Sequence, residues 1–398
     1  MMSDFLVISG GIIGISVARE LKRRYPDCTD TLIEKEHSFA RHARGRNSGV
    51  LHAGFYYTSD SLKARFTRDG NAELTQYCEA HNIPLNRCGK LVVVQSEAEH
   101  SFLDELLRRG RVNNVLLEDI DERTAHEIES RAVTLWRAIF SPTTSSVDPI
   151  AVVRSMEAEA RNESSAIHYG TGYLGRTSDG VRTTVGNFHA GYIVNAAGLY
   201  ADHVAQSFGF SEHYRILPFK GLYLYSEEPP GSLRTHIYPV PDLRHPFLGV
   251  HFIVAVDGHV KIGPTAIPAF WREQYIGLNN FRATECGEIL TRQMGLLMSS
   301  GFGFVRLAWK ELRKYSRKHM VSLASALIRG IKHEHYKQWG KPGIRAQLLN
   351  IKTRKLEMDF VFEADRQSFH ILNAVSPGFT CCMPFSRYVC DAIGEKLI

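Results

Sequence analysis

Six residues near the start of the chain, Ser9–Gly14, have the types and the spacing that bind a phosphate group. They read Ser-Gly-Gly-Ile-Ile-Gly, and Glu34 follows twenty residues after Gly14. Gly11 has no Cβ, so a pyrophosphate can approach the backbone at a helix N-terminus, where unbonded N–H groups favour an anion. A carboxylate at Glu34 can accept hydrogen bonds from ribose hydroxyls. The pattern predicts a dinucleotide site with these contacts: Gly10, Gly11, Ile12, Ile13, Gly14, Glu34 and Lys35.

The flanking residues predict the elements that position this turn. Phe5–Ile8 is apolar throughout, as in a strand buried on both faces of a parallel sheet. A helical pattern then continues to Arg24, and Thr31–Ile33 forms a second strand. The order strand, turn, helix, strand, acid is that of the dinucleotide-binding βαβ unit. Ser9 stands at the first glycine position; it fits there if its φ is negative, so we expect Ser9→Gly to change cofactor affinity only modestly.

Composition and length narrow the class of protein. A chain of 398 residues is long enough for two domains, and 44% hydrophobic with 23% charged residues is typical of soluble globular proteins. No apolar run is long enough to span a bilayer, and a strand starting at Phe5 leaves no room for a signal peptide. Seven cysteines without a Cys-x-x-Cys pair predict neither a disulfide framework nor a zinc site. We therefore expect a cytoplasmic protein.

Positive charge is concentrated in residues 306–341. Ten Lys or Arg stand there against two acidic residues, a local charge of +8 in a chain whose formal net charge is +6. Three interpretations stay open: a surface that meets anionic lipid, a solvated helix face, or a field that attracts an anionic substrate. No nucleic-acid-binding module is recognisable, so nucleic acid is not an expected partner. The apolar residues that interleave with the basic ones are Val305, Leu307, Trp309, Leu312, Leu323, Leu327 and Ile328.

Nucleotide-binding features recur in three separated blocks, which predicts an α/β fold with an insertion. After the first block, an apolar strand at 192–194 runs into small residues, and near the C-terminus a strand at 369–374 runs into Ser-Pro-Gly and a helix. Residues 252–263 read as an antiparallel hairpin turning at Asp257-Gly258. We predict a discontinuous Rossmann-like nucleotide-binding domain with an inserted β-rich α+β substrate domain. The expected ranges are 1–80, 145–215 and 340–398 for the first domain, and 81–144 and 216–339 for the second.

Eight strings are spread in order over nearly the whole chain, and the first and last of them are much more specific than the glycine turn. The strings are Asn47–Tyr57, Ser61–Phe66, Cys88–Leu91, Pro218–Gly221, Tyr238–Pro241, Pro246–His251, Gly343–Gln347 and Asn373–Pro377. These strings resemble the FAD-dependent L-2-hydroxyglutarate oxidase/dehydrogenase family, within the D-amino-acid-oxidase-like flavoproteins. The resemblance implies FAD as the cofactor of the Rossmann-like domain. It adds these expected FAD contacts: Asn47, Ser48, Gly49, Val50, Ala197, Gly198, Pro377, Gly378, Phe379 and Thr380.

The resemblance implies oxidation of a small anionic 2-hydroxy acid, L-2-hydroxyglutarate or a close relative, to the 2-oxo acid. Flavin N5 would accept the hydride, and oxygen or a membrane quinone would take the electrons onward. A histidine is the natural base for the hydroxyl proton, because its pKa lies near working pH. Two histidines lie inside the family-like strings. We expect His251 to be the base and His52 to lie at the flavin.

A dicarboxylate substrate calls for at least two cationic contacts. Arg345 is the expected carboxylate clamp, and Lys220 is assigned to the catalytic set with it. Arg65 and Lys90 are further expected substrate contacts, and Tyr57 and Tyr238 are candidate hydrogen-bond donors. His333-Glu334-His335 lacks the i, i+4 spacing of helical metal ligands, so we expect no metal. We expect Cys381-Cys382 to pack at the flavin end of the domain rather than to act in redox chemistry.

Three departures from the family pattern leave other functions open. Ser9, the segment Ala43–Arg46 and the segment Phe379–Cys382 differ from it, and the last two bear on the substrate more than on flavin binding. One alternative is an amine or amino-acid oxidase of glycine or sarcosine type. Another is a flavin-binding protein that has lost catalysis. The basic residues of 306–341 also leave open a peripheral contact with the inner face of the cell membrane.

Overall fold

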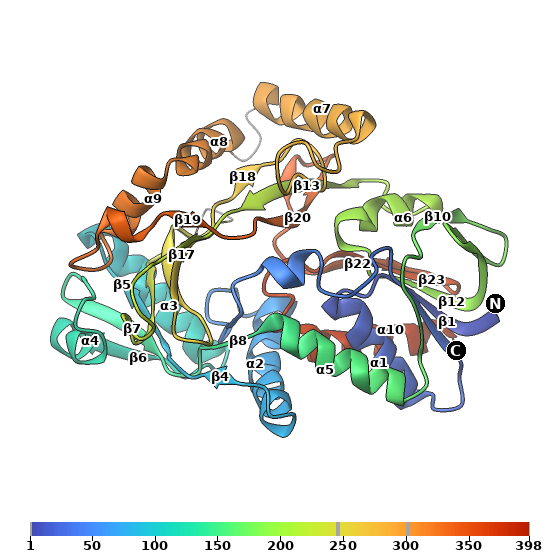
Figure 1. Cartoon of the computed structure of the whole chain (residues 1–398), viewed down its shortest axis with the longest axis horizontal. Coiled ribbons are helices and arrows are strands. Elements are labelled where there is room, and N and C mark those ends of the chain that lie inside the picture. Colours follow the sequence, from blue (N-terminus) through green and yellow to red (C-terminus); the bar gives the residue numbers. More distant parts are fainter. Residues whose placement is uncertain (1, 244–246, 300–302, 398) are drawn as a thin grey trace. The chain divides into compact units, whose positions relative to one another are not determined.

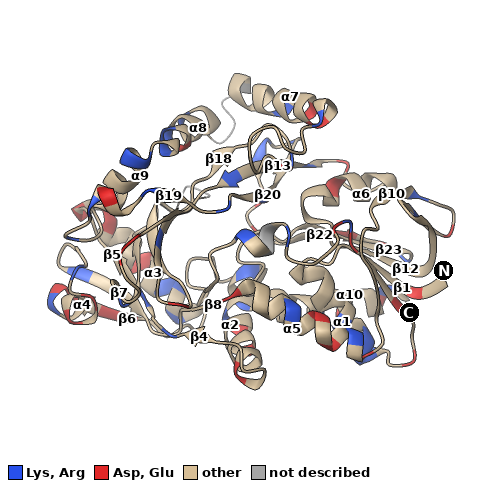
Figure 2. Cartoon of the chain, viewed as in Figure 1, with Lys and Arg blue, Asp and Glu red and all other residues tan. Residues whose placement is uncertain are grey.

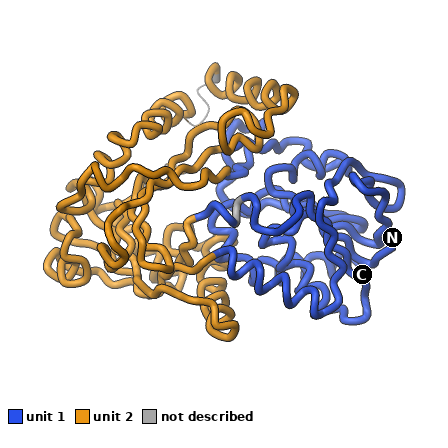
Figure 3. Tube along the Cα trace, in the orientation of Figure 1, with its two compact units in different colours: residues 1–47, 149–218, 345–398 blue, residues 48–148, 219–344 orange. Residues whose placement is uncertain are grey.

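The computed structural model describes residues 2–243, 247–299 and 303–397 (Figure 1). The chain divides into two compact units, and each is made of separate stretches of sequence (Figure 3). Unit 1 comprises residues 1–47, 149–218 and 345–398, and unit 2 comprises residues 48–148 and 219–344. Residues 48–80 belong to unit 2, whereas the sequence had suggested that they continue the nucleotide-binding domain. The discontinuous arrangement itself is the one expected.

Unit 1 is built on a mostly parallel sheet. β1 pairs in parallel with β2 on one side and β12 on the other, β2 pairs with β9, and β12 pairs with β23. β10, β11 and β22 extend the sheet by antiparallel pairing. The strands are β1 Met2–Ile8, β2 Asp30–Ile33, β9 Ala166–His168, β10 Tyr173–Arg176, β11 Gly180–Thr183, β12 Gly186–Asn195, β22 Val361–Ala364 and β23 Ser368–Asn373.

Helices cover this sheet. α1 follows β1 directly and packs against both α5 and α10, so it is buried on more than one face (Figure 1). α6 supplies Val204 to the core cluster that includes Leu6 and Ile193 of the sheet. On α10, Phe385, Val389 and Ile393 are fully buried, whereas Leu397 at the helix end is 49% exposed. The helices are α1 Ile12–Arg24, α5 Pro149–Asn162, α6 Ala201–Ser207 and α10 Cys382–Leu397.

Unit 2 contains an eight-stranded sheet in the order β19-β14-β17-β16-β15-β5-β7-β6. β16 and β17 form the expected hairpin, which turns at Gly258 with a φ of +84°. β15 and β5 are the parallel pair of this sheet. The strands are β5 Lys90–Val93, β6 Glu118–Asp121, β7 Arg137–Ser141, β14 Leu224–Tyr225, β15 His236–Pro239, β16 His251–Val254, β17 Val260–Gly263 and β19 Gln338–Trp339.

One face of this sheet is an apolar core. Alternate residues of a strand point to opposite faces, and the set Leu91, Ile237 and Phe252 packs with α9 residues such as Met320. The opposite face, called the polar face below, carries the polar residues of the candidate site together with apolar ones such as Val92 and Ile253. Around the sheet lie α2 Leu62–Ala80, α3 His100–Val112, α4 Glu122–Ile128, α7 Ala283–Ser299, α8 Phe304–Leu312 and α9 Arg317–Ala324.

Two small sheets complete the fold. β3 Val50–Leu51, β8 Ser145–Val147 and β4 Leu85–Asn86 form one of them in unit 2. The other has the order β18-β13-β20-β21, in which β13 and β20 each contain a boundary between the units. Its strands are β13 Tyr214–Gly221, β18 Ile267–Pro268, β20 Gly343–Asn350 and β21 Lys355–Leu356. Within the described residues, no helix is both long and apolar enough to cross a bilayer.

Candidate functional site

The glycine turn of unit 1 leaves open backbone at the N-terminus of α1. Gly11 is the N-cap residue of α1, and no side chain caps the helix there. A Cβ built on Gly11 meets only the Ser9 hydroxyl, at 3.9 Å, whereas a Cβ on Gly14 would lie 1.9 Å from the Ser9 carbonyl oxygen. Gly14 is therefore required by packing, and Gly11 faces space that a ligand can occupy. Uncapped N–H groups beside open space fit a pyrophosphate.

The carboxylate of Glu34 fixes the conformation of the glycine turn through hydrogen bonds to the backbone. Its carboxylate accepts a hydrogen bond from the Gly10 N–H at 2.8 Å and another from the Glu36 N–H at 3.0 Å. The side chain is 6% exposed. A carboxylate oxygen can accept more than one hydrogen bond, so a ribose contact is compatible with this geometry and stays a prediction. Lys35, the next predicted contact, is exposed, and its Nζ lies 5.0 Å from the ring centre of Tyr200.

The backbone at Ser9 does not have the negative φ that the sequence analysis assumed. Its φ is +90°, a region that residues with a Cβ rarely adopt. The Ser9 hydroxyl lies 3.5 Å from Glu34 Oε2, at the limit of a hydrogen bond. Glycine would meet no Cβ strain at this position, which explains why the motif prefers it. Serine is tolerated here under strain.

The other predicted FAD contacts of unit 1 lie in two loops that follow strands. Asn195, at the end of β12, accepts the Ala197 N–H at 3.1 Å and donates to the Ala201 carbonyl at 2.8 Å. This fixes the loop in which Gly198 has a φ of +54° and open space around it. After β23, Phe379 and Thr380 are buried in the turn that leads into α10. Pro377 and Gly378 lie in the same turn.

The second predicted flavin loop spans the boundary between the units. Asn47 is the last residue of that stretch of unit 1, and Ser48, Gly49 and Val50 begin unit 2. Gly49 has a φ of +78°, and its carbonyl accepts the Val147 N–H at 2.9 Å. The loop is thus shaped by glycine and tied to β8. Its contact with FAD stays a prediction.

The polar face of the large sheet in unit 2 gathers several of the predicted site residues. Lys90 pairs with His236 across β5 and β15, and Tyr238 lies two residues further along β15 on the same face. The pairing of β15 with β16, and of β16 with β17, puts His251 and Lys261 on this face as well. All five side chains are at most 6% exposed. The strands around them, β5, β14, β15, β16 and β17, contain neither Asp nor Glu.

His251 has the geometry of a proton acceptor. Its Nδ1 lies 2.7 Å from the Gly249 carbonyl oxygen, which accepts only, so Nδ1 carries the hydrogen and Nε2 carries the lone pair. The imidazole stacks on the Tyr238 ring with centres 3.7 Å apart and planes at 22°. Burial, followed by the positive charge of Lys90, lowers the pKa of His251 to about 3, although the bond to Gly249 acts in the other direction. The ring is therefore neutral across the physiological pH range.

Lys90 is a buried ammonium surrounded by aromatic rings. Its Nζ lies 4.5 Å from the ring centre of Tyr238, 5.1 Å from that of Tyr56 and 5.5 Å from that of Phe55. Nζ has no hydrogen-bond partner among the described residues, and neither has the buried hydroxyl of Tyr56. Burial lowers the pKa of Lys90 to about 7. Lys90 Nζ and the Tyr56 hydroxyl are thus two buried donors without a protein partner on neighbouring side chains, which points to an anionic ligand.

His236, by contrast, contacts protein groups through both of its ring nitrogens. Its Nδ1 accepts the Val254 N–H at 3.0 Å, so Nε2 carries the hydrogen of the neutral ring. Nε2 lies 3.4 Å from both the Ser146 hydroxyl and the Cys88 sulfur. Burial lowers the pKa of His236 and raises the pKa of the Cys88 thiol to about 11, so both are uncharged. These contacts hold the His236 ring in a fixed orientation.

The remaining predicted catalytic and substrate residues lie elsewhere. His52 and Tyr57 are half-buried in the loop after β3, and Arg65 is exposed on α2 over the ring of Phe66. Lys220 is half-buried on β13, where burial lowers its pKa. Arg345 lies on β20 in unit 1. Pro246, the first residue of one family-like string, lies outside the described residues. The roles of these residues stay predictions.

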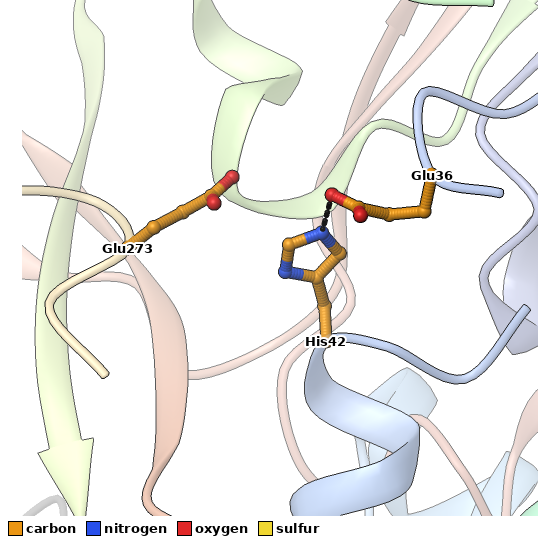
Figure 4. Close-up of side chains that lie close together, drawn as sticks. All are labelled: Glu36, His42 and Glu273. Atoms are coloured by element: carbon orange, nitrogen blue, oxygen red, sulfur yellow. Dashed lines mark hydrogen bonds and ion pairs between the residues drawn. The ribbon is translucent and has the colours of Figure 1, made fainter. Parts of the chain in front are cut away.

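Two further groups bear on metal and thiol chemistry. His42 Nε2 lies 2.9 Å from a Glu36 carboxylate oxygen within unit 1, and Figure 4 shows this pair. The two side chains form an ion pair when His42 is protonated, and the expectation that the protein holds no metal stays a prediction. Cys381 and Cys382 are both fully buried at the start of α10. Their burial agrees with the packing role expected for them.

Sequence reasoning missed two residues of this face. Tyr56 lies inside a family-like string, but the loop has no periodicity that tells which of Tyr56 and Tyr57 points inward. Lys261 follows the hairpin turn and alternates with Val260 and Ile262, which are buried on the opposite face. That alternation was the available signal: an apolar strand with one lysine on its inner face implies an ammonium in need of an anion.

Comparisons with known proteins identify the family and agree with the fold. Residues 4–392 match the family described as FAD dependent oxidoreductase. A mitochondrial L-2-hydroxyglutarate dehydrogenase of Nematostella vectensis is 34% identical to this chain, with 99% of this chain and 91% of the relative covered. The L-2-hydroxyglutarate dehydrogenase of Escherichia coli K12 is 31% identical, with 100% and 94% covered.

Solved structures show the same fold at lower identity. The FAD-bound L-α-glycerophosphate oxidase of Mycoplasma pneumoniae has a TM-score of 0.78 at 19% identity, over 99% of this chain and 95% of that one. Glycine oxidase of Geobacillus kaustophilus has a TM-score of 0.72 at 17% identity, over 100% and 96%. At these identities the likeness concerns the fold alone.

Proposed function

The chain belongs to the L-2-hydroxyglutarate dehydrogenase family of FAD-dependent oxidoreductases, and from this membership we propose that it oxidises L-2-hydroxyglutarate, or a close 2-hydroxy acid, to the 2-oxo acid. FAD is its cofactor, and when bound it supplies the acceptor for the hydride from C2. The observation that carries the proposal is the grouping of Lys90, Tyr56 and His251 on one buried face of unit 2. The three supply an ammonium, a hydroxyl and a neutral base.

His251 is the proposed base for the C2 hydroxyl proton. The base must be unprotonated before the reaction, and the Nδ1–H bond to Gly249 leaves Nε2 as the position that receives the proton. The charge of Lys90 contributes to the low pKa of His251. A substrate carboxylate beside Lys90 would offset that charge and raise the pKa of His251. Substrate binding would thus strengthen the base at the moment when it is needed.

Lys90 and Tyr56 are the proposed ligands of one substrate carboxylate. Both polar groups are buried without a protein partner, and leaving such donors unsatisfied costs about 1–3 kcal/mol each, more for a charge. A carboxylate can satisfy both at once, since it accepts several hydrogen bonds. Tyr238 contacts both Lys90 and His251 and so sets the position of the base relative to the ammonium. Arg345, Lys220, Arg65, Tyr57 and His52 keep the substrate or flavin roles proposed from the resemblance.

Anaerobic reduction of the bound flavin tests this proposal. The purified protein should be yellow, and L-2-hydroxyglutarate should bleach the flavin where glycine and sarcosine do not. His251→Ala should retain the flavin spectrum and lose reduction, and His333→Ala, which removes an exposed histidine of the same unit, should behave as wild type. Flavin reduction that persists in His251→Ala would place the base elsewhere. Reduction by amines alone would make the chain an amine oxidase.

We also propose that electrons continue to oxygen or to a membrane quinone, with unit 2 resting on the inner face of the cell membrane. α8 carries an exposed apolar stripe, Val305, Trp309 and Leu312, at helical spacing, next to the exposed bases Arg306 and Lys310 (Figure 2). α7 packs against α8 and has its own exposed stripe. That stripe comprises Leu290, Met294, Leu297 and Met298.

The structure narrows the segment that the sequence suggested for this contact. Leu327 and Ile328 are buried in the apolar core of unit 2, so they cannot meet lipid. Lys314 is also buried, and it forms an ion pair with Glu311. The proposed membrane surface is therefore α7 together with α8, and the exposed bases that follow attract anionic lipid.

A further inference from the structure

Lys261 is a second buried ammonium on the polar face of unit 2. It is 6% exposed, and its Nζ lies over two aromatic rings, 4.9 Å from the centre of Tyr223 and 5.7 Å from that of Tyr225. Among the described residues it forms no hydrogen bond or ion pair. Burial lowers its pKa to about 8, and Asp257 offsets this only in part. The side chain therefore lies where an ammonium is costly unless an anion joins it.

Lys261 and Lys90 lie on the same face at a spacing that suits one small molecule. β17 and β5 are separated by β16 and β15, so the two backbones are three strand spacings apart, about 14 Å. Tyr223, Tyr238 and Ile253 belong to one buried cluster, and Ile253 pairs with Lys261 across β16 and β17. The two carboxyl carbons of a five-carbon diacid lie about 5 Å apart by standard bond lengths. Two lysine side chains that extend toward each other can cover the difference between these two lengths.

We propose that Lys261 binds the second carboxylate of the substrate and so makes the site selective for dicarboxylic 2-hydroxy acids. This rests on the proposed function, in which Lys90 and Tyr56 hold the carboxylate next to the reacting carbon. The face contributes two ammonium groups from β5 and β17 and no carboxylate from the five strands around them. A dianion matches both charges, whereas a monocarboxylate leaves one buried charge without a partner. The aromatic rings offset only part of that cost, since a cation–π contact is weaker than the hydration that a buried ammonium loses.

Substrate selectivity tests this role. Lys261→Met should lower kcat/KM for L-2-hydroxyglutarate by about 10- to 100-fold, the loss of one charge-assisted hydrogen bond, and leave kcat/KM for L-2-hydroxybutyrate unchanged or raised. Lys90→Met should lower kcat/KM for both substrates. Lys352→Met, at an exposed turn, is the matched control and should change neither. An equal loss on both substrates in Lys261→Met would overturn the assignment.

A binding measurement separates this proposal from the proposed function. Glutarate and butyrate, neither of which can be oxidised at C2, should be titrated into the flavin-loaded protein while thermal unfolding is followed. Glutarate should raise Tm more than butyrate, and Lys261→Met should abolish the difference. If no hydroxy acid reduces the flavin but glutarate still needs Lys261, only the proposed reaction fails. If glutarate and butyrate act alike on the wild type, Lys261 does not select dicarboxylates.

Discussion

Lys90 Nζ lies 4.5 Å from the centre of the Tyr238 ring, and it has no hydrogen-bond partner among the described residues. The ring attracts the cation by about 2 kcal/mol at a desolvated site. Burying an ammonium costs several kcal/mol even after the protein relaxes. The cost is larger, so Lys90 destabilises the unliganded fold. Such a residue is explained by binding rather than by stability.

Lys90→Met should therefore stabilise the protein while abolishing turnover. Methionine has similar length and no charge, and replacing a buried ion in this way gains about 1–4 kcal/mol at pH 7. The folded-state pKa of Lys90, about 7, lies below its unfolded value, so the unfolded chain binds more protons between about pH 7 and pH 10. Wild-type stability should thus rise with pH in that window. Urea unfolding at pH 7 and pH 9 checks this, and a gap between the two proteins that widens with pH would contradict it.

The ionisation of Lys90 predicts that catalytic activity falls at high pH. Only charged Lys90 attracts the substrate carboxylate, and its pKa of about 7 applies to the free enzyme. kcat/KM should fall tenfold per pH unit above about pH 7, because it reports ionisations of the free enzyme. The profile of kcat should fall at higher pH, since a bound carboxylate raises the pKa of Lys90. Steady-state kinetics from pH 6 to pH 9 measure both. Coincident limbs for kcat and kcat/KM would show that another group titrates.

Ser9→Gly should stabilise the nucleotide-binding turn. Serine at a φ of +90° is strained, and glycine is not, so we expect a gain of about 1 kcal/mol. Ser16→Gly is the matched control, because Ser16 lies within α1 and glycine there should cost about 1 kcal/mol. Chemical denaturation of the three proteins gives the values. FAD affinity should change modestly at most, since Gly11 provides the close backbone approach in each. A loss of stability in Ser9→Gly would mean that its hydroxyl contact to Glu34 outweighs the strain.

Much of this fold could be predicted from local patterns, and the site only in part. The βαβ unit and the β16–β17 hairpin follow from apolar runs and turn glycines, which act over short stretches of chain. Strand register is different, because it is set by partners distant in sequence. The grouping of Lys90 with His251 depends on β15 lying between them, and nothing local to either residue announces it. The positive φ of Ser9 is likewise imposed by the turn around it.

The concentration of basic residues in 306–341 is visible in the sequence, but the sequence does not show which of the apolar residues between them are exposed. Nine of the ten bases of 306–341 are exposed, yet the apolar residues between them divide between core and surface. Leu327 and Ile328 belong to the core under the sheet, whereas Trp309 is 69% exposed. Composition does not distinguish these cases, because a buried helix face and a lipid-facing one use the same side chains. Leu327 and Ile328 are buried because they pack in the same core as the α9 residues Met320 and Val321.

The α7–α8 surface should bind anionic vesicles through both charge and apolar contact. Val305→Glu with Trp309→Glu should lower partitioning onto phosphatidylglycerol-containing phosphatidylcholine vesicles at least tenfold, because it removes apolar area and repels the lipid. Trp136→Glu is the matched control: Trp136 is 58% exposed in the same unit but outside α7 and α8. Raising the salt concentration should weaken wild-type binding in part, since screening removes only the electrostatic share. Cosedimentation measures each case. Equal binding by both variants, or equal binding to uncharged vesicles, would show that this surface does not meet the membrane.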